Sequence, residues 1–462
     1  MRVARAVFVL TGAMLAALAA AGLLMLDRHG VSPAALAFHL GTDSGTATRW
    51  TRQALLRLDR PPPVPLALDR LSFGARAIAA AAPAPLREVA AANLAALRSA
   101  MAQATPGDRI TLAAGVWRIG QVPLAASRAG TASAYITVRG APGARLDVDG
   151  AQGFLVSAPF WRFEQLVMRG VCARHADCEH AFHVVGDAHH FSAQGNTITD
   201  FNAHLKINGH GGRFPDSGTI DGNRLTNSAP RRTSLPVTPI DLVGASGWTI
   251  RHNLIADFIK EGGDYTSYGA YAKGAGAHNA FEQNIIWCEH LLRARPGLRV
   301  GLSLGGGGTE ARFCRDGRCI VEQEDSRVAA NLVASCSADG IYLNSAARST
   351  VRHNTLVGTG GIVLRYPTSS ADVEGNLLDA PIRAGDGAIL RAVDNRTAPL
   401  AYRYFGAHAL ADVLGADMAW RGAPPRRSAA GAAPPDLCGV ARPSLPAYGA
   451  FEEFSACRAG TR

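Results

Sequence analysis

A short unit built around asparagine recurs along the chain and constrains its fold more than any other feature. The unit reads x-Asn-x-apolar, and successive asparagines are separated by 27, 30, 31, 47, 23 and 22 residues. The repeated residues are Asn196, Asn223, Asn253, Asn284, Asn331, Asn354 and Asn376. A period of about 20–30 residues with Asn at a fixed phase is typical of a right-handed parallel β-helix, where stacked Asn side chains hydrogen-bond between coils. The leucine-rich repeat, the nearest competitor, requires Leu at several positions that these units lack.

A second repeated pattern lies between the asparagine units and predicts one sheet of the solenoid. Each run is apolar at its first and third positions, so the residues between them point outward, because side chains alternate along a strand. One predicted outward column contains Lys206, Asp241, Tyr271, Ser303, Tyr342 and Val363, and the next contains Asn208, Val243, Lys273, Gly305, Asn344 and Arg365. Stacked strands lie about 4.8 Å apart, which places Lys206, Asp241, Tyr271 and Lys273 on three coils within about 10 Å.

The length and composition favour one elongated, repetitive domain with short additions. The 462 residues include 47% hydrophobic and 18% charged residues, which argues against disorder, and only one segment is apolar enough to cross a bilayer. We expect an all-β fold, with a helix from Pro85 to about Ala104 that caps the N-terminal end. The predicted units are a signal-anchor helix (1–27), a juxtamembrane linker (28–82), the capping helix plus β-helix (83–395), and a C-terminal cap with a Pro/Ala/Arg-rich tail (396–462).

The N-terminal segment predicts export. Arg2 and Arg5 precede an uncharged run of 21 residues, 6–26, which as a helix spans roughly 31 Å. An uncleaved inner-membrane anchor with the remainder in the periplasm is therefore expected. A cleaved signal peptide, with an A-x-A site at residues 19–21, is the alternative and would give a secreted protein.

The eight cysteines agree with an oxidising compartment, because their number is even and several lie in plausible pairs. The predicted disulfides are Cys172–Cys178, Cys288–Cys336, Cys314–Cys319 and Cys438–Cys457. A metal site is the rival interpretation, but no C-x-x-C pair occurs and neighbouring histidines lack ligand spacing. We therefore predict no metal from the cysteines.

The charge of the chain favours an acidic partner. Lys and Arg number 47 against 37 Asp and Glu, a net charge of +10. Nucleic acid, anionic lipid and uronic-acid polysaccharide all fit this charge, although an exported compartment argues against nucleic acid. Only Lys206, Lys260 and Lys273 are lysines. Coding bias explains the excess of arginine. Under that bias the remaining lysines are candidates for positions where Arg cannot substitute, because a lysine amine can lose its proton.

The outward columns contain the groups that β-elimination on a uronic acid needs. That reaction requires a base for the proton α to the carboxylate, a cation near the enolate and an acid for the leaving oxygen. Lys273 or Lys206 is the candidate base, and Tyr271, Tyr268 or Tyr265 is the candidate acid. The predicted substrate-binding residues are Lys206, Asn208, Asp241, Arg293 and Arg295, and the histidines His204, His210 and His278 are also available. The competing interpretation is that these side chains are ordinary solvated residues of an outer face.

Several segments resemble the right-handed β-helix superfamily of polysaccharide lyases, nearest to the chondroitinase B and alginate lyase family. They are residues 107–117, residues 135–143 and the Asn units. The resemblance implies a Lys base followed by an Asn-containing turn, which Lys273 and Asn279 match, and an Arg acid about one coil later, for which Arg299, Arg293 or Arg295 is available. It also implies calcium held by an Asn and two Glu, but the corresponding strand, 268–272, contains no Glu.

The function expected from the sequence is action on an acidic polysaccharide. Lyase-type β-elimination by Lys273, Tyr271 and Arg299 is the leading hypothesis, and no cofactor is predicted. The missing calcium carboxylates leave epimerase and hydrolase chemistry open. A non-catalytic polysaccharide-binding or structural protein of the cell envelope is the alternative, and the oligomeric state stays open.

Overall fold

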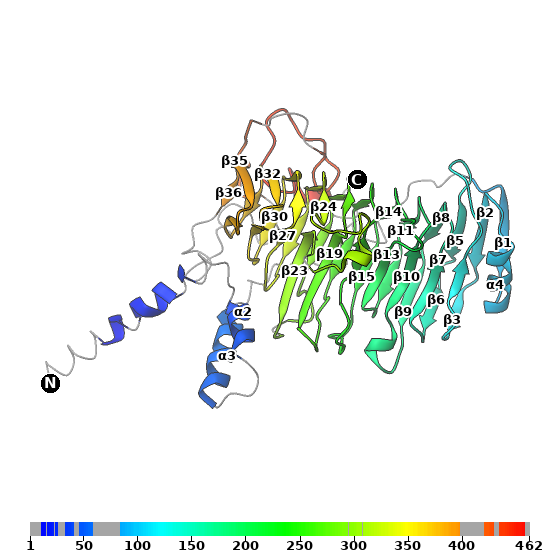
Figure 1. The fold of residues 1–462 in the computed structure, drawn as a ribbon, viewed down its shortest axis with the longest axis horizontal. Helices are drawn as coiled ribbons and strands as arrows, with labels where there is room; N and C mark the ends of the chain where they lie inside the picture. The colour runs from blue at the N-terminus through cyan, green and yellow to red at the C-terminus, as the bar shows by residue number, and fades with distance from the viewer. Residues whose placement is uncertain are drawn as a thin grey trace.

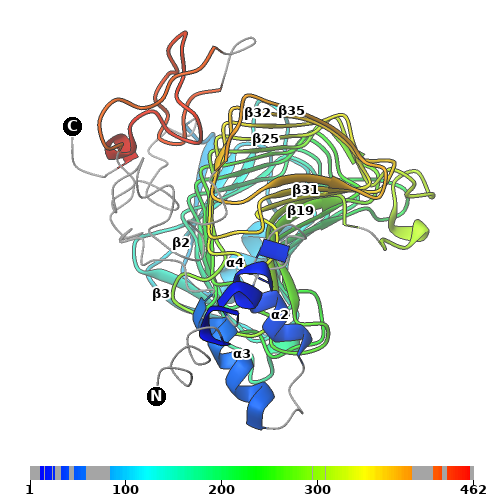
Figure 2. The same ribbon diagram turned by 90° about the vertical axis from the view of Figure 1, so that its left-hand side faces the viewer.

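The fold is a solenoid of short parallel strands, seen in a computed structural model (Figure 1). The structure describes residues 11–14, 16–22, 24–25, 33–40, 46–58, 84–293, 295–306, 308–397, 420–428 and 434–457. In the end-on view of Figure 2, the strands of successive coils superimpose around a common interior. The predicted parallel β-helix is therefore confirmed.

Three long sheets and one short sheet form the walls of the solenoid. The twelve-stranded sheet has the order β1 (Arg87–Ala91), β2 (Asp108–Leu112), β5 (Ile136–Gly140), β8 (Trp161–Glu164), β11 (Ser192–Gln194), β14 (Thr219–Asp221), β17 (Thr249–Arg251), β21 (Ala280–Glu282), β25 (Arg327–Ala329), β29 (Ser349–Arg352), β32 (Ser370–Glu374) and β35 (Ile389–Val393). The ten-stranded sheet has the order β34 (Ile382–Gly385), β31 (Ile362–Arg365), β27 (Ile341–Asn344), β23 (Leu298–Leu304), β19 (Thr266–Lys273), β16 (Ile240–Val243), β13 (Ala203–Asn208), β10 (His180–Val185), β7 (Gln152–Val156) and β4 (Leu124–Ala126). The eleven-stranded sheet has the order β3 (Gly115–Ile119), β6 (Ala144–Val148), β9 (Val167–Gly170), β12 (Thr197–Thr199), β15 (Arg224–Thr226), β18 (Leu254–Ala256), β22 (Ile285–Trp287), β26 (Leu332–Ala334), β30 (Thr355–Val357), β33 (Leu377–Leu378) and β36 (Arg396–Thr397). The short sheet contains β20 (Gly276–Ala277), β24 (Gln323–Glu324) and β28 (Ala346–Ala347).

The repeated asparagines form a continuous ladder between the twelve- and eleven-stranded sheets. Asn253 Nδ2 donates to Asn284 Oδ1 at 3.0 Å, and Asn284 Nδ2 donates to Asn331 Oδ1 at 3.0 Å. The predicted ladder is confirmed from Asn196 to Asn376, and Asn395 extends it by one coil. The sequence pattern missed Asn395 because no apolar residue stands two positions after it.

The interior is filled by the alternating apolar side chains of the strands. Leu205 and Ile207 of β13 pair with Ile240 and Leu242 of β16, and all four are fully buried. Large aromatic rings extend the stack, since Phe154 and Phe182 lie parallel with centroids 5.1 Å apart. Side-chain alternation along parallel strands therefore determines which residues enter the core.

The helix predicted from Pro85 begins later than expected. Residues Arg87–Ala91 form β1, which pairs with β2, and helix α4 (Leu94–Ala102) follows. Asn93 caps this helix by accepting a hydrogen bond from Ala96 N at 2.9 Å. Pairing with the exposed edge of β2 outweighs the helical periodicity of residues 85–91. Helix α4 packs on β1 and β2 at the end of the solenoid (Figure 1).

All four predicted disulfides are present. Cys172–Cys178 and Cys314–Cys319 close short loops, and Cys438–Cys457 lies in the tail. Cys288–Cys336 joins neighbouring coils just after the ends of β22 and β26, at Trp287 and Ala334. The cysteine pairs read from the spacing are therefore confirmed, and no described cysteine is free.

The described part of the tail packs along the side of the solenoid. Figure 2 shows it, in red, outside the ring of strands. Leu437, Phe451 and Phe454 of the tail pack against apolar outward residues of the eleven-stranded sheet, among them Leu254, Ile285, Leu332 and Leu377. The described part of the predicted C-terminal cap therefore covers a lateral face.

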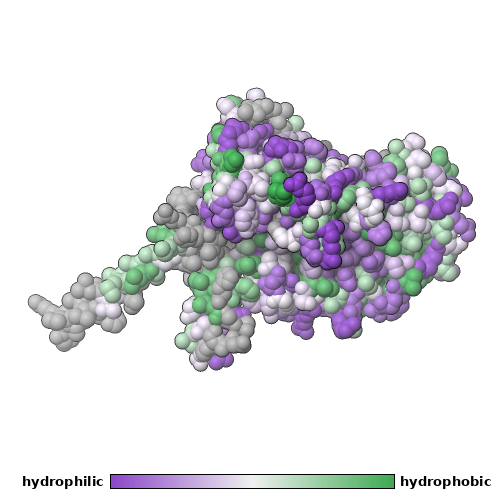
Figure 3. Space-filling view, in the orientation of Figure 1, coloured by the Kyte–Doolittle hydropathy of each residue, from purple (hydrophilic) through white to green (hydrophobic). Residues whose placement is uncertain are grey.

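The predicted anchor falls partly outside the described residues. Among the residues that are described, no helix is both long and apolar enough to cross a membrane. The described residues between 11 and 25 expose apolar side chains such as Met14, Leu18 and Met25, visible as the green extension in Figure 3. Helices α2 (Pro33–His39) and α3 (Thr46–Leu58) pack together, and Phe38 of α2 contacts the ring of Tyr265.

Candidate functional site

The predicted outward column exists with the predicted register. Lys206 pairs with Asp241, Asp241 with Tyr271, and Tyr271 with Ser303. The same column continues through Tyr342 to Val363. The alignment of the repeated runs is therefore confirmed on this sheet. We name the outward face of β10, β13, β16, β19 and β23 the groove face.

The second predicted column is continuous only in part. Asn208 pairs with Val243 and Val243 with Lys273, as expected. Strand β23 ends at Leu304, and Gly305 turns away with φ +72°. The chain then enters residues 308–322, which we name the insert. Figure 2 shows the insert as the yellow-green segment beyond the end of β19 and β31.

An ion pair between Lys206 and Asp241 lies at the centre of the groove face. Lys206 Nζ lies 2.8 Å from Asp241 Oδ2. The side chain of Lys206 is 22% exposed, whereas Asp241 is only 3% exposed. Asp241 and its neighbour Tyr271, at 5% exposure, are therefore enclosed rather than freely solvated. Their burial is hard to reconcile with an ordinary outer face.

Lys273 lies beside this pair and has no ion-pair partner among the described residues. Its Nζ lies 4.6 Å from the centroid of the Tyr271 ring, a cation–π contact. Burial lowers the pKa of Lys273, and the charge of Lys206 acts in the same direction. The carboxylates of Asp241 and Glu322 oppose that shift. Lys273 is thus biased toward releasing its proton.

Tyr271 lies next to Lys273, and Tyr268 lies next to Tyr271. The rings of Tyr268 and Tyr271 meet edge to face with centroids 5.5 Å apart. Burial raises the pKa of both phenols, and the charge of Asp241 raises the pKa of Tyr271 further. Both hydroxyls therefore stay protonated at neutral pH. Tyr265, the third candidate, instead contacts Phe38 of α2.

His183 belongs to the groove face and was missed from the sequence. It precedes Lys206 in the same column. Its Nε2 lies 2.9 Å from Asn208 Oδ1, while Asn208 Nδ2 donates to Gly209 O. Burial lowers the pKa of His183, so the neutral ring donates from Nε2. The run Phe182-His183-Val184 has the same alternation as the aligned runs and could have extended the column by one coil.

The structure removes Arg299 from the candidate site. Arg299 is fully buried and pairs with Glu289 at 2.6 Å. Its guanidinium also donates to the carbonyl oxygens of Pro296 and Arg295. The guanidinium of Arg299 is thus inaccessible to a substrate, because the protein surrounds it. The prediction failed because Arg299 lies at the start of a long strand, where it anchors the preceding loop.

Arg293 and Arg295 also lie away from Lys273. Arg293 Nε donates to His290 O, and Arg295 Nη1 lies 3.8 Å from Glu261 Oε1. Both residues precede β23, whose first residue pairs with Thr266, whereas Lys273 ends β19. Seven residues of strand separate the two ends by about 20 Å. These arginines cannot contact the same sugar unit as Lys273.

The predicted histidines lie outside the groove face. His204 is fully buried and its Nε2 donates to Thr226 O at 2.9 Å. His210 and His278 are exposed in turns. Asn279, matched by resemblance to a catalytic turn, is buried and donates to Ala245 O. These residues have structural roles or face solvent.

Two buried histidines make the stability of the fold depend on pH. Burial lowers the pKa of His204 to about 4 and that of His353 to about 3, against an ordinary 6.5. Below pH 6.5 these two histidines bind protons in the unfolded chain but stay neutral in the folded chain. The free energy of unfolding therefore decreases as the pH falls toward 4. We expect His204 alone to account for about 3 kcal/mol at pH 4.

Thermal unfolding of His204→Gln between pH 7 and pH 4 measures this contribution. The amide can still donate to Thr226 O but cannot take up a proton, so the variant should lose less stability than the wild type. His278→Gln, a change at an exposed histidine, is the control and should follow the wild type. Equal acid sensitivity of all three proteins would contradict the assignment.

The calcium that the resemblance implies lacks its two Glu ligands in the corresponding strand, 268–272. Three or more His, Cys, Asp or Glu residues do not come together anywhere in the described parts of the chain. On the groove face Asp241 is already paired with Lys206. No step of the proposed chemistry therefore uses the ion.

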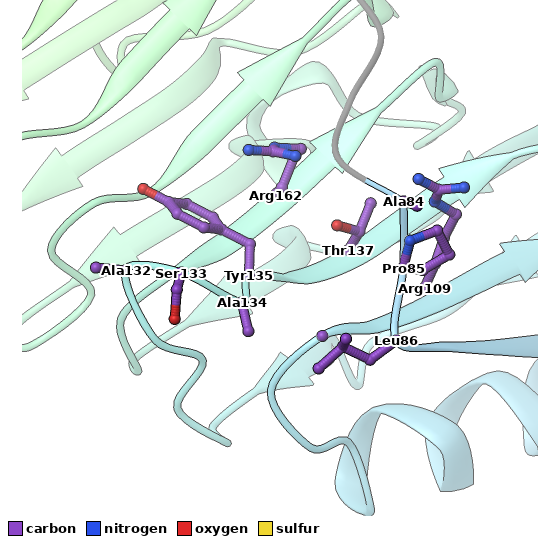
Figure 4. A pocket seen from close by; sticks show the side chains of 11 residues that line it. Ala84, Pro85, Leu86, Arg109, Ala132, Ser133, Ala134, Tyr135, Thr137 and Arg162 are labelled. Carbon is purple, nitrogen blue, oxygen red and sulfur yellow. The ribbon is translucent and has the colours of Figure 1, made fainter.

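A pocket of about 130 Å³ lies on a different sheet, near the N-terminal end. Figure 4 shows Tyr135 and Arg162 on one side of it and Pro85, Leu86 and Arg109 on the other. The Arg162 guanidinium lies 4.8 Å from the centroid of the Tyr135 ring. Strands β2, β5 and β8 supply Arg109, Thr137 and Arg162. This pocket is separate from the groove face.

A match to a family model supports the fold. Residues 180–378 match the family described as right handed beta helix region. Among solved structures, the chain is similar to the pectate lyase Pel9A (15% identity, 80% of this chain and 97% of that chain, TM-score 0.49). It is also similar to an alginate lyase from Paenibacillus sp. (17% identity, 68% and 96%, TM-score 0.37) and to a rhamnogalacturonan lyase (12% identity, 66% and 81%, TM-score 0.42). No curated protein matches the sequence.

Proposed function

We propose that the groove face binds an acidic, uronic-acid polysaccharide and that Lys273 catalyses its β-elimination. The observation that carries the proposal is the position of Lys273. This lysine is partly buried on the groove face, has no ion-pair partner among the described residues, and lies beside the Lys206–Asp241 pair and the Tyr271 ring. Because its pKa is lowered, such an amine is neutral, and therefore able to accept a proton, at a lower pH than an ordinary lysine.

The proposed reaction assigns one task to each group. The neutral amine of Lys273 takes the proton α to the substrate carboxylate. The electron pair of that C–H bond forms a double bond to the β carbon, and the β carbon–oxygen bond breaks. Tyr271 donates its proton to the leaving alkoxide, which is a stronger base than a phenolate. The ammonium of Lys206 lies on the same face and stabilises the carboxylate as negative charge develops on it.

The location of the proposed activity is outside the cytoplasm. Four disulfides support an oxidising compartment, because thiols in the cytosol are kept reduced. The uncharged run 6–26 after two arginines supports attachment to the inner membrane, with the solenoid in the periplasm. Cleavage after residue 21 would release the protein instead.

The test is to incubate the purified full-length protein with polygalacturonate, alginate, chondroitin and hyaluronan. Elimination creates a double bond conjugated to the carboxylate, so at least one polymer should give rising ultraviolet absorbance. A neutral glucan is the control and should give none. Retention on an acidic polymer without an absorbance change would support the binding-protein alternative. Neither retention nor absorbance with any acidic polymer would overturn the proposal.

A further inference from the structure

Arg315 joins the insert to two earlier turns at the end of the groove face. Its Nη1 and Nη2 each lie 2.7 Å from an oxygen of Asp216, in the turn after β13. Nη1 also donates to Gly244 O and Ser246 Oγ, in the turn after β16. The guanidinium lies 4.8 Å from the centroid of the Phe214 ring. One side chain thus joins the insert, which follows β23, to the turns of two earlier coils.

The insert also holds the peptide that directly follows Lys273. Arg315 N donates to Gly274 O at 2.9 Å, and Gly274 N donates to Glu322 Oε2 at 3.4 Å. Gly274 has φ +78°, and a Cβ there would come within 2.9 Å of Gly244 N. Both backbone hydrogen-bonding groups of Gly274 are therefore satisfied by the insert.

The backbone just before the insert, at Gly306, packs against the side chain of Lys273 itself. A Cβ added to Gly306 would lie 2.7 Å from Lys273 Cδ, so the backbone there passes directly over the lysine stem. The Cys314–Cys319 disulfide closes the insert loop next to Arg315. The covalent loop and the Arg315–Asp216 pair together fix where this backbone runs.

We propose that Arg315 is a positioning residue that, by joining the insert to the turns after β13 and β16, keeps Lys273 against the Tyr271 ring. The effect of Arg315 on turnover rests on the proposed function, whereas its effect on the position of Lys273 does not depend on any catalytic activity. Arg315 contacts neither the Tyr271 ring nor the lysine ammonium. It acts through the backbone of Gly274 and through the insert.

Release of the insert would expose Lys273 to water. The charged groups that face Lys273 are Lys206, Asp241 and Glu322, and Tyr271 covers its other side. Burial is the main cause of the lowered pKa of Lys273, and increased solvation would reverse that effect. We therefore expect loss of the Arg315–Asp216 pair to raise the pH at which Lys273 titrates.

The three lysines of the chain make this titration directly measurable. Reductive methylation with ¹³C-formaldehyde labels Lys206, Lys260, Lys273 and the N-terminal amine, and each signal is followed by NMR as the pH is raised. Single Lys→Arg variants assign the signals. The measurement needs neither a substrate nor catalytic activity.

Arg315→Ala and Asp216→Asn are the test variants, and Arg312→Ala is the matched control. Arg312 belongs to the same insert, but its described contacts are with Glu310 and Phe313, also in the insert. Both test variants should raise the Lys273 midpoint by about one pH unit, because both release the insert. A direct charge effect would instead give opposite shifts, since one change removes a positive charge and the other a negative charge.

Two results would overturn the inference. One is a Lys273 midpoint that is unchanged in both test variants, with far-ultraviolet circular dichroism equal to that of the wild type. The other is a pair of opposite shifts. If Arg315→Ala does not fold, the nearly isosteric Asp216→Asn decides the question. Where turnover is measurable, Arg315→Ala should lower kcat about tenfold with little change in KM. If the wild type shows no turnover, the proposed function is refuted, but the NMR titration still tests whether Arg315 positions Lys273.

Discussion

Replacing Lys273 by Arg is expected to preserve glycan binding and to reduce kcat by roughly 10²–10⁴, the usual contribution of a positioned general base. The guanidinium keeps the positive charge at the groove face but cannot lose its proton at working pH. Initial rates from the ultraviolet absorbance, together with retention on the same polymer, measure the two effects separately.

Lys260→Arg is the matched control for this prediction. Lys260 is paired with Asp264 at 2.5 Å and lies outside the groove face, so its replacement should leave kcat unchanged. In the wild type, kcat/KM should rise with pH as Lys273 deprotonates, and burial places this rise below the ordinary lysine pKa of 10.5. Wild-type turnover by Lys273→Arg would show that another group is the base.

Truncation of one central asparagine should destabilise the solenoid by about 3–6 kcal/mol, because several buried groups lose their partners at about 1–3 kcal/mol each. Asn284 Nδ2 donates to Ile250 O and to Asn331 Oδ1. Asn284 Oδ1 accepts from the backbone and side-chain nitrogens of Asn253. Asn284→Ala leaves these groups unpaired in a fully buried turn, and urea unfolding followed by circular dichroism measures the cost.

Asn395→Ala provides the comparison at the end of the same ladder. Asn395 is half-buried, so water can replace the hydrogen bonds that it makes to Val373 O and Asn376. Its truncation should cost about 1 kcal/mol. If Asn284→Ala were no more destabilising than Asn395→Ala, the ladder would contribute little to the stability of the central coils.

The groove face was partly predictable because it is built from residues in register. Lys206, Asp241 and Tyr271 were placed together by alternation alone, and the strand pairing confirms this column. Lys273 was placed on the next column, where it pairs with Val243. Periodicity does not predict that Arg299 is buried. It gives the position of a residue along a coil, but not the contacts that the residue makes with the preceding loop.

The sequence by itself determined the parallel β-helix, the Asn ladder and the four disulfides. Most of these features repeat between neighbouring coils or close short loops, and Cys438–Cys457 joins the two cysteines of the tail, so the spacing of residue types suffices to specify them. Only the tertiary structure decided which outward side chains are enclosed. Arg315 reaches Asp216 across 99 residues, and the tail covers the eleven-stranded sheet with Phe451 and Leu437. Contacts of that kind depend on how irregular segments pack in space, and no period in the sequence encodes their path.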